Sequence, residues 1–86
     1  MDNREYISVV ADYLPDGTIK PALIVFADDS AFTIARIKSV VDMSATKQNG
    51  TEIRYCVEIG GCEHYLFFEA ASQKRPPGWF VLDHAL

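Results

Sequence analysis

The sequence predicts an all-β fold, a single small barrel or roll of five to six antiparallel strands that takes in residues 1–86 as one domain. Short runs rich in β-branched and aromatic residues recur about every ten residues, with turn-forming residues between them. A chain of 86 residues holds one domain at most. Because an open sheet of this size would leave an apolar face in water, we expect the sheet to curl on itself.

The strongest single pattern is a β-hairpin within residues 51–69, with Gly60-Gly61 as its loop. A two-residue loop places Ile59 opposite Cys62. The pairs that then share the expected core face are Val57/His64, Tyr55/Leu66 and Ile53/Phe68. The pairs on the other face are Glu58/Glu63, Cys56/Tyr65, Arg54/Phe67 and Glu52/Glu69. A register slipped by one residue would instead turn Tyr65 and Phe67 inward.

A first hairpin is predicted from residues 6–13 and 19–26, joined by a turn. Pro15-Asp16-Gly17 has the composition of a type I turn that closes into a bulge. Pro21 cannot donate a backbone hydrogen bond, so it marks an edge, a bulge or the first paired residue of its strand. Asp28-Asp29-Ser30 is predicted to be the next turn.

Residues 31–43 fit two templates. Ile34, Ile37 and Val41 match helical spacing, with Ser30 as an N-cap, whereas the many Ile, Val and Thr residues favour a strand. We expect a long strand with a bulge near Ala35-Arg36, and a helix is the alternative.

The rest of the chain is predicted to consist of two loops and a last strand. Residues 44–50 end in Asn-Gly and residues 70–77 contain Pro-Pro, so both are loops. Residues 78–84 form the last strand.

Charge and hydropathy exclude several classes of protein. The formal net charge of −4 disfavours a nucleic-acid partner, because binding to phosphate depends on cationic side chains. No apolar run is long enough to span a membrane, and the amino terminus lacks the pattern of a signal peptide, so a cytoplasmic location is expected. The two cysteines, Cys56 and Cys62, are expected to be reduced thiols, because they project to opposite faces of the predicted hairpin.

The strand and turn residues also resemble those of a known group of proteins. The similar residues are Asp16-Gly17, Phe32-Thr-Ile34, Arg54-Tyr55, Val57-x-Ile59-x-Gly61, Leu66-Phe67-Phe68-Glu69 and Trp79-Phe80-Val81. In these the chain resembles short bacterial proteins, common in Firmicutes, that are small SH3-like β-barrels without an assigned function. The resemblance spans most of residues 6–81. It implies an SH3-like barrel and carries no functional residue over.

Candidate chemistry is sparse, and we expect neither catalysis nor a cofactor. Cys62 and His64 lie two residues apart on one face of a strand, as in a metal or thiol site. A zinc site needs further ligands, and a Cys-His nucleophile needs an orienting group and oxyanion donors, which no pattern in the sequence supplies. We therefore expect Cys62 to be a small core residue and His64 a polar residue at the rim.

Protein binding is the expected function. Arg54, Cys56, Tyr65 and Phe67 share the outer face of the predicted hairpin, and aromatic residues with Arg are typical of interface anchors. Alternatively, residues 70–82 cover this face, or the slipped register buries it. The expected partner is another protein or a second copy of the chain in a homodimer. The alternative functions are a small barrel that binds single-stranded nucleic acid and a minor metal or thiol protein that uses Cys62 and His64.

Overall fold

The computed structural model describes residues 4–43, 52–71 and 76–82, and these residues form strands and connecting turns. The strands are β1 (Arg4–Tyr13), β2 (Ile19–Val25), β3 (Ala31–Thr33), β4 (Arg36–Asp42), β5 (Glu52–Ile59), β6 (Cys62–Glu69) and β7 (Gly78–Leu82). In this part of the chain no helix is long and apolar enough to cross a membrane. The predicted loop at residues 44–50, much of the one at 70–77, and Asp83 and His84 lie outside the described residues.

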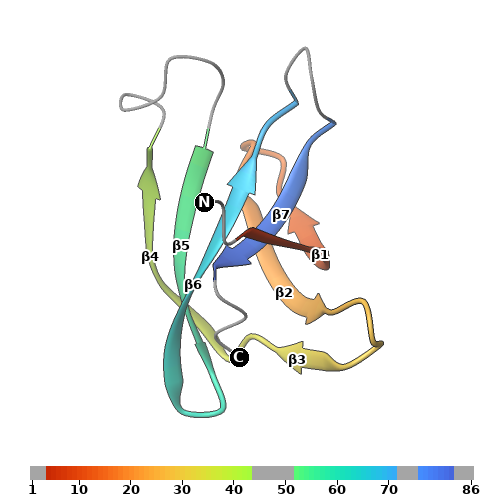
Figure 1. Ribbon diagram of the computed structural model, residues 1–86. Coiled ribbons are helices and arrows are strands. Elements are labelled where there is room, and N and C mark those ends of the chain that lie inside the picture. The colour runs from red at the N-terminus through yellow and green to blue at the C-terminus, as the bar shows by residue number, and fades with distance from the viewer. Residues whose placement is uncertain (1–3, 44–51, 72–75, 83–86) are drawn as a thin grey trace.

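The seven strands form one antiparallel sheet in the order β3-β2-β1-β7-β6-β5-β4. The strands at its two edges, β3 and β4, are consecutive in the chain, with only Ile34 and Ala35 between them. The sheet must therefore curl until its edges approach each other. The Ile34 N–H donates to the Ala22 carbonyl of β2 (2.9 Å), and the Ala35 N–H donates to the Glu58 carbonyl of β5 (2.8 Å). These two bonds connect the joint to a strand near each edge of the sheet. The predicted all-β roll is confirmed as a curled half-barrel (Figure 1).

The hairpin of β5 and β6 has the predicted register at every pair, from Ile59 opposite Cys62 to Glu52 opposite Glu69. Gly60 and Gly61 have φ angles of 59° and 82°, the left-handed values that a tight two-residue loop between antiparallel strands requires. The slipped register is therefore wrong.

Two turns of the first half of the chain share one geometry. In the predicted turn at Pro15-Asp16-Gly17, the Gly17 N–H donates to the Leu14 carbonyl, and the Leu14 N–H donates to the Thr18 carbonyl. The turn from Phe26 to Ser30 repeats both bonds. Its fourth position, where the first turn has Gly17 (φ 90°), is Asp29 (φ 70°), the one residue other than glycine in the described chain with a positive φ.

The segment 31–43 is extended, so the helical alternative is wrong. It is not one strand, however, because Ile34 and Ala35 interrupt it and separate β3 from β4, close to the predicted bulge. This break gives the sheet seven strands instead of the expected five or six. A second irregularity lies between Ile37 and Ser39, where the register of β4 against β5 shifts.

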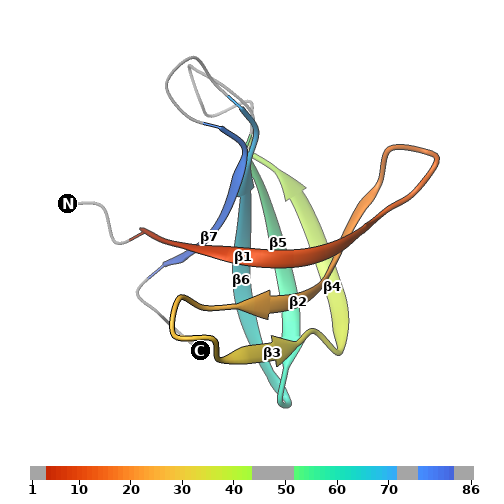
Figure 2. The same cartoon turned by 90° about the vertical axis from the view of Figure 1, so that its right-hand side faces the viewer.

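The core lies between two layers of the curled sheet. Figure 2 shows β1, β2 and β3 running across β4 to β7. The inward side chains of both layers pack together between them. The buried members of this cluster are Ile24, Phe26, Ile34, Tyr55, Val57, Ile59, Leu66, Trp79 and Val81. Ile53 and Phe68 pack against them, so the predicted core face of the hairpin is the inner face. His64 lies in the same register and is half-buried.

Candidate interaction surfaces

The outer face of the sheet carries its own aromatic layer. Phe67 of β6 and Phe80 of β7 are direct partners in the sheet, and their rings stack with centroids 5.0 Å apart and planes within 3°. Tyr6 of β1 is the partner of Phe80 on the other side, with ring centroids 5.5 Å apart. The Arg4 guanidinium lies 4.4 Å above the Phe80 ring. Phe80 is therefore 1% exposed although it points away from the core.

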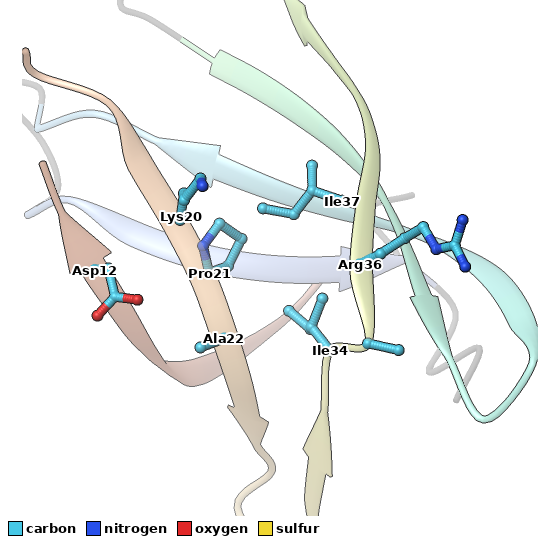
Figure 3. A pocket seen from close by; sticks show the side chains of 8 residues that line it. Asp12, Lys20, Pro21, Ala22, Ile34, Arg36 and Ile37 are labelled. Carbon is cyan, nitrogen blue, oxygen red and sulfur yellow. The ribbon is translucent and has the colours of Figure 1, made fainter.

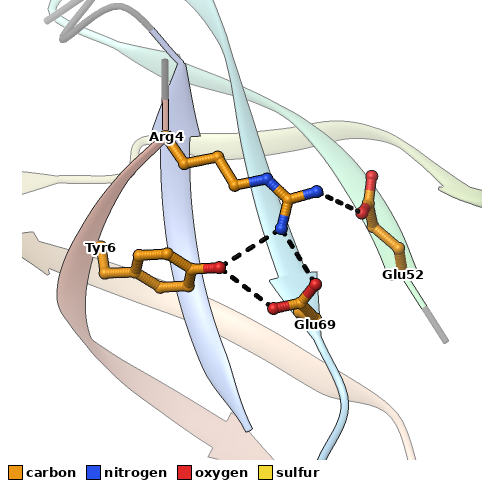
Figure 4. Close-up of polar contacts among 4 residues, drawn as sticks. All are labelled: Arg4, Tyr6, Glu52 and Glu69. Carbon is orange, nitrogen blue, oxygen red and sulfur yellow. Dashed lines mark hydrogen bonds and ion pairs between the residues drawn. The ribbon is translucent and has the colours of Figure 1, made fainter. Parts of the chain in front are cut away.

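Four polar side chains close over this layer (Figure 4). Arg4 Nη1 donates to Glu69 Oε2 (2.9 Å) and to the Tyr6 hydroxyl (3.2 Å), and that hydroxyl donates to Glu69 Oε1 (3.1 Å). Arg4 Nη2 also forms an ion pair with Glu52 at 3.6 Å. The hydrogen bonds with Tyr6 and Glu69 raise the pKa of Arg4 above its usual value. The cluster thus connects the start of β1 with β5 and β6, on the far side of β7.

Gly78 lies beside the Tyr6 ring. Gly78 belongs to β7 and pairs with Glu69 of β6, and a Cβ placed on it would lie 3.5 Å from that ring, an ordinary van der Waals distance. The Tyr6 ring therefore passes close over β7 to reach the Glu69 carboxylate, with room at residue 78 for a Cβ.

The four residues of the predicted interaction surface do share the outer face, but they are unequally accessible. Phe67 and Cys56 are buried, Phe67 beneath the aromatic layer to which β7 contributes. Tyr65 is 54% exposed, and the Arg54 guanidinium lies 4.7 Å above its ring. Of the predicted surface, the stacked pair Arg54 and Tyr65 is what a partner could contact.

Cys56 is enclosed by neighbouring polar groups on the same face. Its Sγ donates to Glu63 Oε1 (3.8 Å), and Glu63 Oε2 accepts a hydrogen bond from Lys38 Nζ (2.8 Å). The Lys38 ammonium lowers the pKa of Glu63, and the carboxylate in turn raises the pKa of Lys38. This arrangement leaves Cys56 as a packed thiol.

Cys62 and His64 do not gather further ligands around them. Both cysteines are free, and Cys62 is exposed whereas Cys56 is buried. The prediction that Cys62 is a small core residue is therefore wrong, because Cys62 directly follows the two-glycine loop at the end of the hairpin, outside the core cluster. Among the residues that the structure describes, no group of three or more His, Cys, Asp or Glu side chains could hold a metal ion.

The open edge of β4 is a feature that the sequence did not reveal. The Met43 N–H donates to the Glu52 carbonyl (2.7 Å), so these two residues form a hydrogen-bonded pair. Such pairs alternate along antiparallel strands, so Val41 also directs its backbone toward β5 and Val40 directs its N–H and C=O away from it. No described strand lies on that side of β4. The side chains of Val40 and Val41 are 55% and 38% exposed.

A cleft of about 300 Å³ lies between the start of β2 and the joint of β3 and β4. It is lined by Asp12, Lys20, Pro21, Ala22, Ile34, Ala35, Arg36 and Ile37. Figure 3 shows Pro21 directed into this space from β2, and Ile34 and Ile37 from the other side, whereas Arg36 points away. Tyr55 bridges the two layers beside the cleft, because its hydroxyl donates to the Ile19 carbonyl (3.2 Å).

Pro21 was the one signal in the sequence that pointed to this region, because proline marks an unpaired side of a strand.

Comparison of the chain with protein-family models, with curated proteins and with solved structures found no match. The likeness to SH3-like bacterial barrels therefore stays a prediction.

Proposed function

We propose that this domain is a non-catalytic protein-interaction module that binds an extended segment of a partner protein as an added strand on β4. The observation that carries the proposal is the open edge at Val40, whose backbone donor and acceptor face away from β5. Natural edge strands are usually protected by Lys, Pro or bulges. β4 has such protection at the bulge around Lys38, but its second half exposes Val40 and Val41.

The other unpaired edges are less suited to binding a strand. β3 has three residues, too few for a stable ladder. At the start of β2, the Ile19 carbonyl already accepts a hydrogen bond from Tyr55. Of the two terminal strands of the described sheet, β4 is thus the longer and the better suited to pair with an added strand.

Charge supports a peptide rather than a nucleic acid as the partner. Of the five basic side chains in the described residues, Arg4, Arg36 and Lys38 form ion pairs with carboxylates of the same chain. The formal net charge of the whole chain is −4. Binding to a phosphate backbone needs several uncompensated cations, whereas strand addition depends on main-chain hydrogen bonds.

Selection from a phage-displayed peptide library on the immobilised domain tests the proposal. We expect enriched peptides to bind the wild type and Val40→Thr, and to bind Val40→Pro at least about tenfold more weakly, because proline removes the outward N–H. Val40→Thr is the matched control, since it keeps that donor and the β propensity. Equal binding to Val40→Pro, or no enriched peptide, would overturn strand addition.

Self-association is examined with the same variants by sedimentation velocity. A wild-type dimer that Val40→Pro dissociates would make a second copy the bound strand and support the proposal. A dimer that persists in Val40→Pro and is lost in Tyr65→Ser would instead place the interface on the Arg54–Tyr65 pair and count against β4. That pair is the second candidate surface, because it is the accessible Arg–aromatic contact of the outer face.

A further inference from the structure

The cleft beside β4 joins an apolar floor to charged side chains. Ile34 and Pro21 are buried and Ile37 is half-buried, and all three line the cleft. Its charged lining residues are Lys20, Asp12 and Arg36, of which Arg36 points away from the space (Figure 3). Lys20 is exposed and directly precedes Pro21 on β2, so a ligand here would meet an ammonium group beside aliphatic surface.

Lys20 differs from the other basic residues of the described chain in its electrostatic surroundings. Arg4, Arg36 and Lys38 are ion-paired, and Arg54 stacks on Tyr65. No described carboxylate forms an ion pair with Lys20, although Asp12 is its sheet partner on β1. Hydrogen bonds from Thr18, and then the charge of Lys20, lower the pKa of Asp16 in the neighbouring turn. Within the described residues, Lys20 is the Lys or Arg side chain that has neither an ion pair nor a ring contact, so it is the one available to a partner's negative charge.

The cleft also lies beside the open edge of β4. Ile37 belongs to β4 and lines the cleft, and Val40 follows it on the same strand. A strand added to β4 would run along the mouth of the cleft. Its side chains would alternate, so a residue that packs on Ile37 and Pro21 would have neighbours directed toward the other face.

We infer that the strand acceptor of this domain recognises an acidic extended segment, in which an apolar side chain packs against Pro21 and Ile37 and a Glu or Asp two residues away, on the same face of the added strand, meets Lys20. This inference rests on the proposed function and adds the chemistry of the partner. Main-chain pairing with β4 provides affinity that is independent of sequence, and the carboxylate provides selectivity.

Synthetic peptides separate these two contributions. The probes are acetylated and amidated ten-residue peptides of alternating Val and Ser, with one Glu placed at each successive position, and a matched set with Gln. In fluorescence polarisation with the wild type, we expect the best Glu peptide to bind about threefold more tightly than its Gln counterpart, because the exposed Lys20 ammonium forms an ion pair with the carboxylate but only a charge–dipole hydrogen bond with the amide. Added salt should reduce this preference.

Variants at the exposed Lys20 then assign the preference to one side chain. Lys20→Gln should bind the Glu and Gln peptides equally, and Lys20→Glu should prefer the same peptide with Lys in place of Glu. Lys38→Gln is the control, because Lys38 is already paired with Glu63 and should leave the preference unchanged.

The outcomes distinguish the inference from the function on which it rests. Peptides that bind the wild type, fail on Val40→Pro and show no preference for Glu would overturn the acidic segment and leave strand addition standing. A preference for Glu that persists in Lys20→Gln would also overturn the inference. Binding of no peptide by the wild type would overturn both.

Discussion

Two residues, one on the central strand of the sheet and one on a terminal strand, are buried and exposed in the opposite way from what their direction predicts. Phe80 points to the outer face and is 1% exposed, whereas Val40, the direct partner of the inward-pointing Tyr55, is 55% exposed. On the side of β1, β7 and β6, side chains cover both faces of the sheet. On the side of β4, the curled sheet stays open and leaves even its inner face accessible. Burial in this half-barrel therefore depends on what lies across from a residue as much as on the face it occupies.

The largest effect should come from comparing these two residues. Phe80→Ala removes a buried ring that Phe67, Tyr6 and Arg4 contact, and should lower the free energy of unfolding by about 3–5 kcal/mol. Val40→Ala should change it by less than about 1 kcal/mol, because the side chain is half in water. Urea denaturation of both variants measures the difference. Similar losses for the two would contradict the division into a covered side and an open side.

The Arg4 cluster should contribute the next largest effect to the covered side. Arg4→Leu leaves the Glu52 and Glu69 carboxylates, which are sheet partners, without their shared cation. A fully buried pair broken in this way costs about 3–5 kcal/mol, and since these side chains are 9–24% exposed we expect about 2 kcal/mol. Arg4→Lys is the control for charge alone, and urea midpoints give the comparison. If Arg4→Leu left the free energy of unfolding unchanged, the cluster would contribute nothing to stability.

Tyr55→Phe tests the bridge between the two layers. It removes the hydrogen bond to Ile19 and should cost about 1 kcal/mol at pH 7. Burial, and then the charge of Tyr13, raises the pKa of Tyr55, so the folded protein holds this proton more tightly than the unfolded chain. The wild type should therefore lose stability as the pH rises above the unfolded value of about 10. Urea denaturation at a series of pH values from 7 to 11 measures this loss, which should be smaller in Tyr55→Phe. If the free energy of unfolding fell equally with pH in both proteins, Tyr55 would not be the group responsible.

The smallest expected effect concerns the two turns of equal geometry. Asp29 occupies the left-handed position that glycine occupies at residue 17. Asp29→Gly should remove the strain of a positive φ at a residue with a side chain and so raise the free energy of unfolding. The gain should be only about 0.5 kcal/mol, because glycine also makes the unfolded chain more flexible, which offsets part of the relieved strain. Gly17→Ala, the reverse change, should lower it by about 1 kcal/mol. Thermal melting compares the pair, and destabilisation by Asp29→Gly would show that its side chain matters more than its backbone.

The sequence predicted what local patterns determine. The register of the β5–β6 hairpin followed from Gly60-Gly61 and the alternation before it, and the first turn followed from Pro15-Asp16-Gly17. The burial of Phe67 could not be predicted from its own strand, because it depends on β7 lying beside β6 and on Arg4 and Tyr6 reaching over Phe80. The cleft was also hidden, because it arises from the curvature of the whole sheet.

The break at Ile34 and Ala35 was foreseen as a bulge near that place, but not as a change of layer. A bulge and a switch between layers have the same local composition. What decides between them is that Ala22 and Glu58, from two different strands, accept the N–H groups of the two residues. Such long-range partners cannot be recognised in a single sequence, which is why the strand count came out low.

The position of β7 between β1 and β6 has a consequence for the order in which the molecule assembles. The first three strands can join through neighbouring turns, and so can the next three, while the polypeptide is still leaving the ribosome. No ladder of hydrogen bonds joins these two halves directly until β7 pairs with both β1 and β6. Completion should therefore be slow for so small a protein, because the ladder of β1 and β7 closes the widest loop.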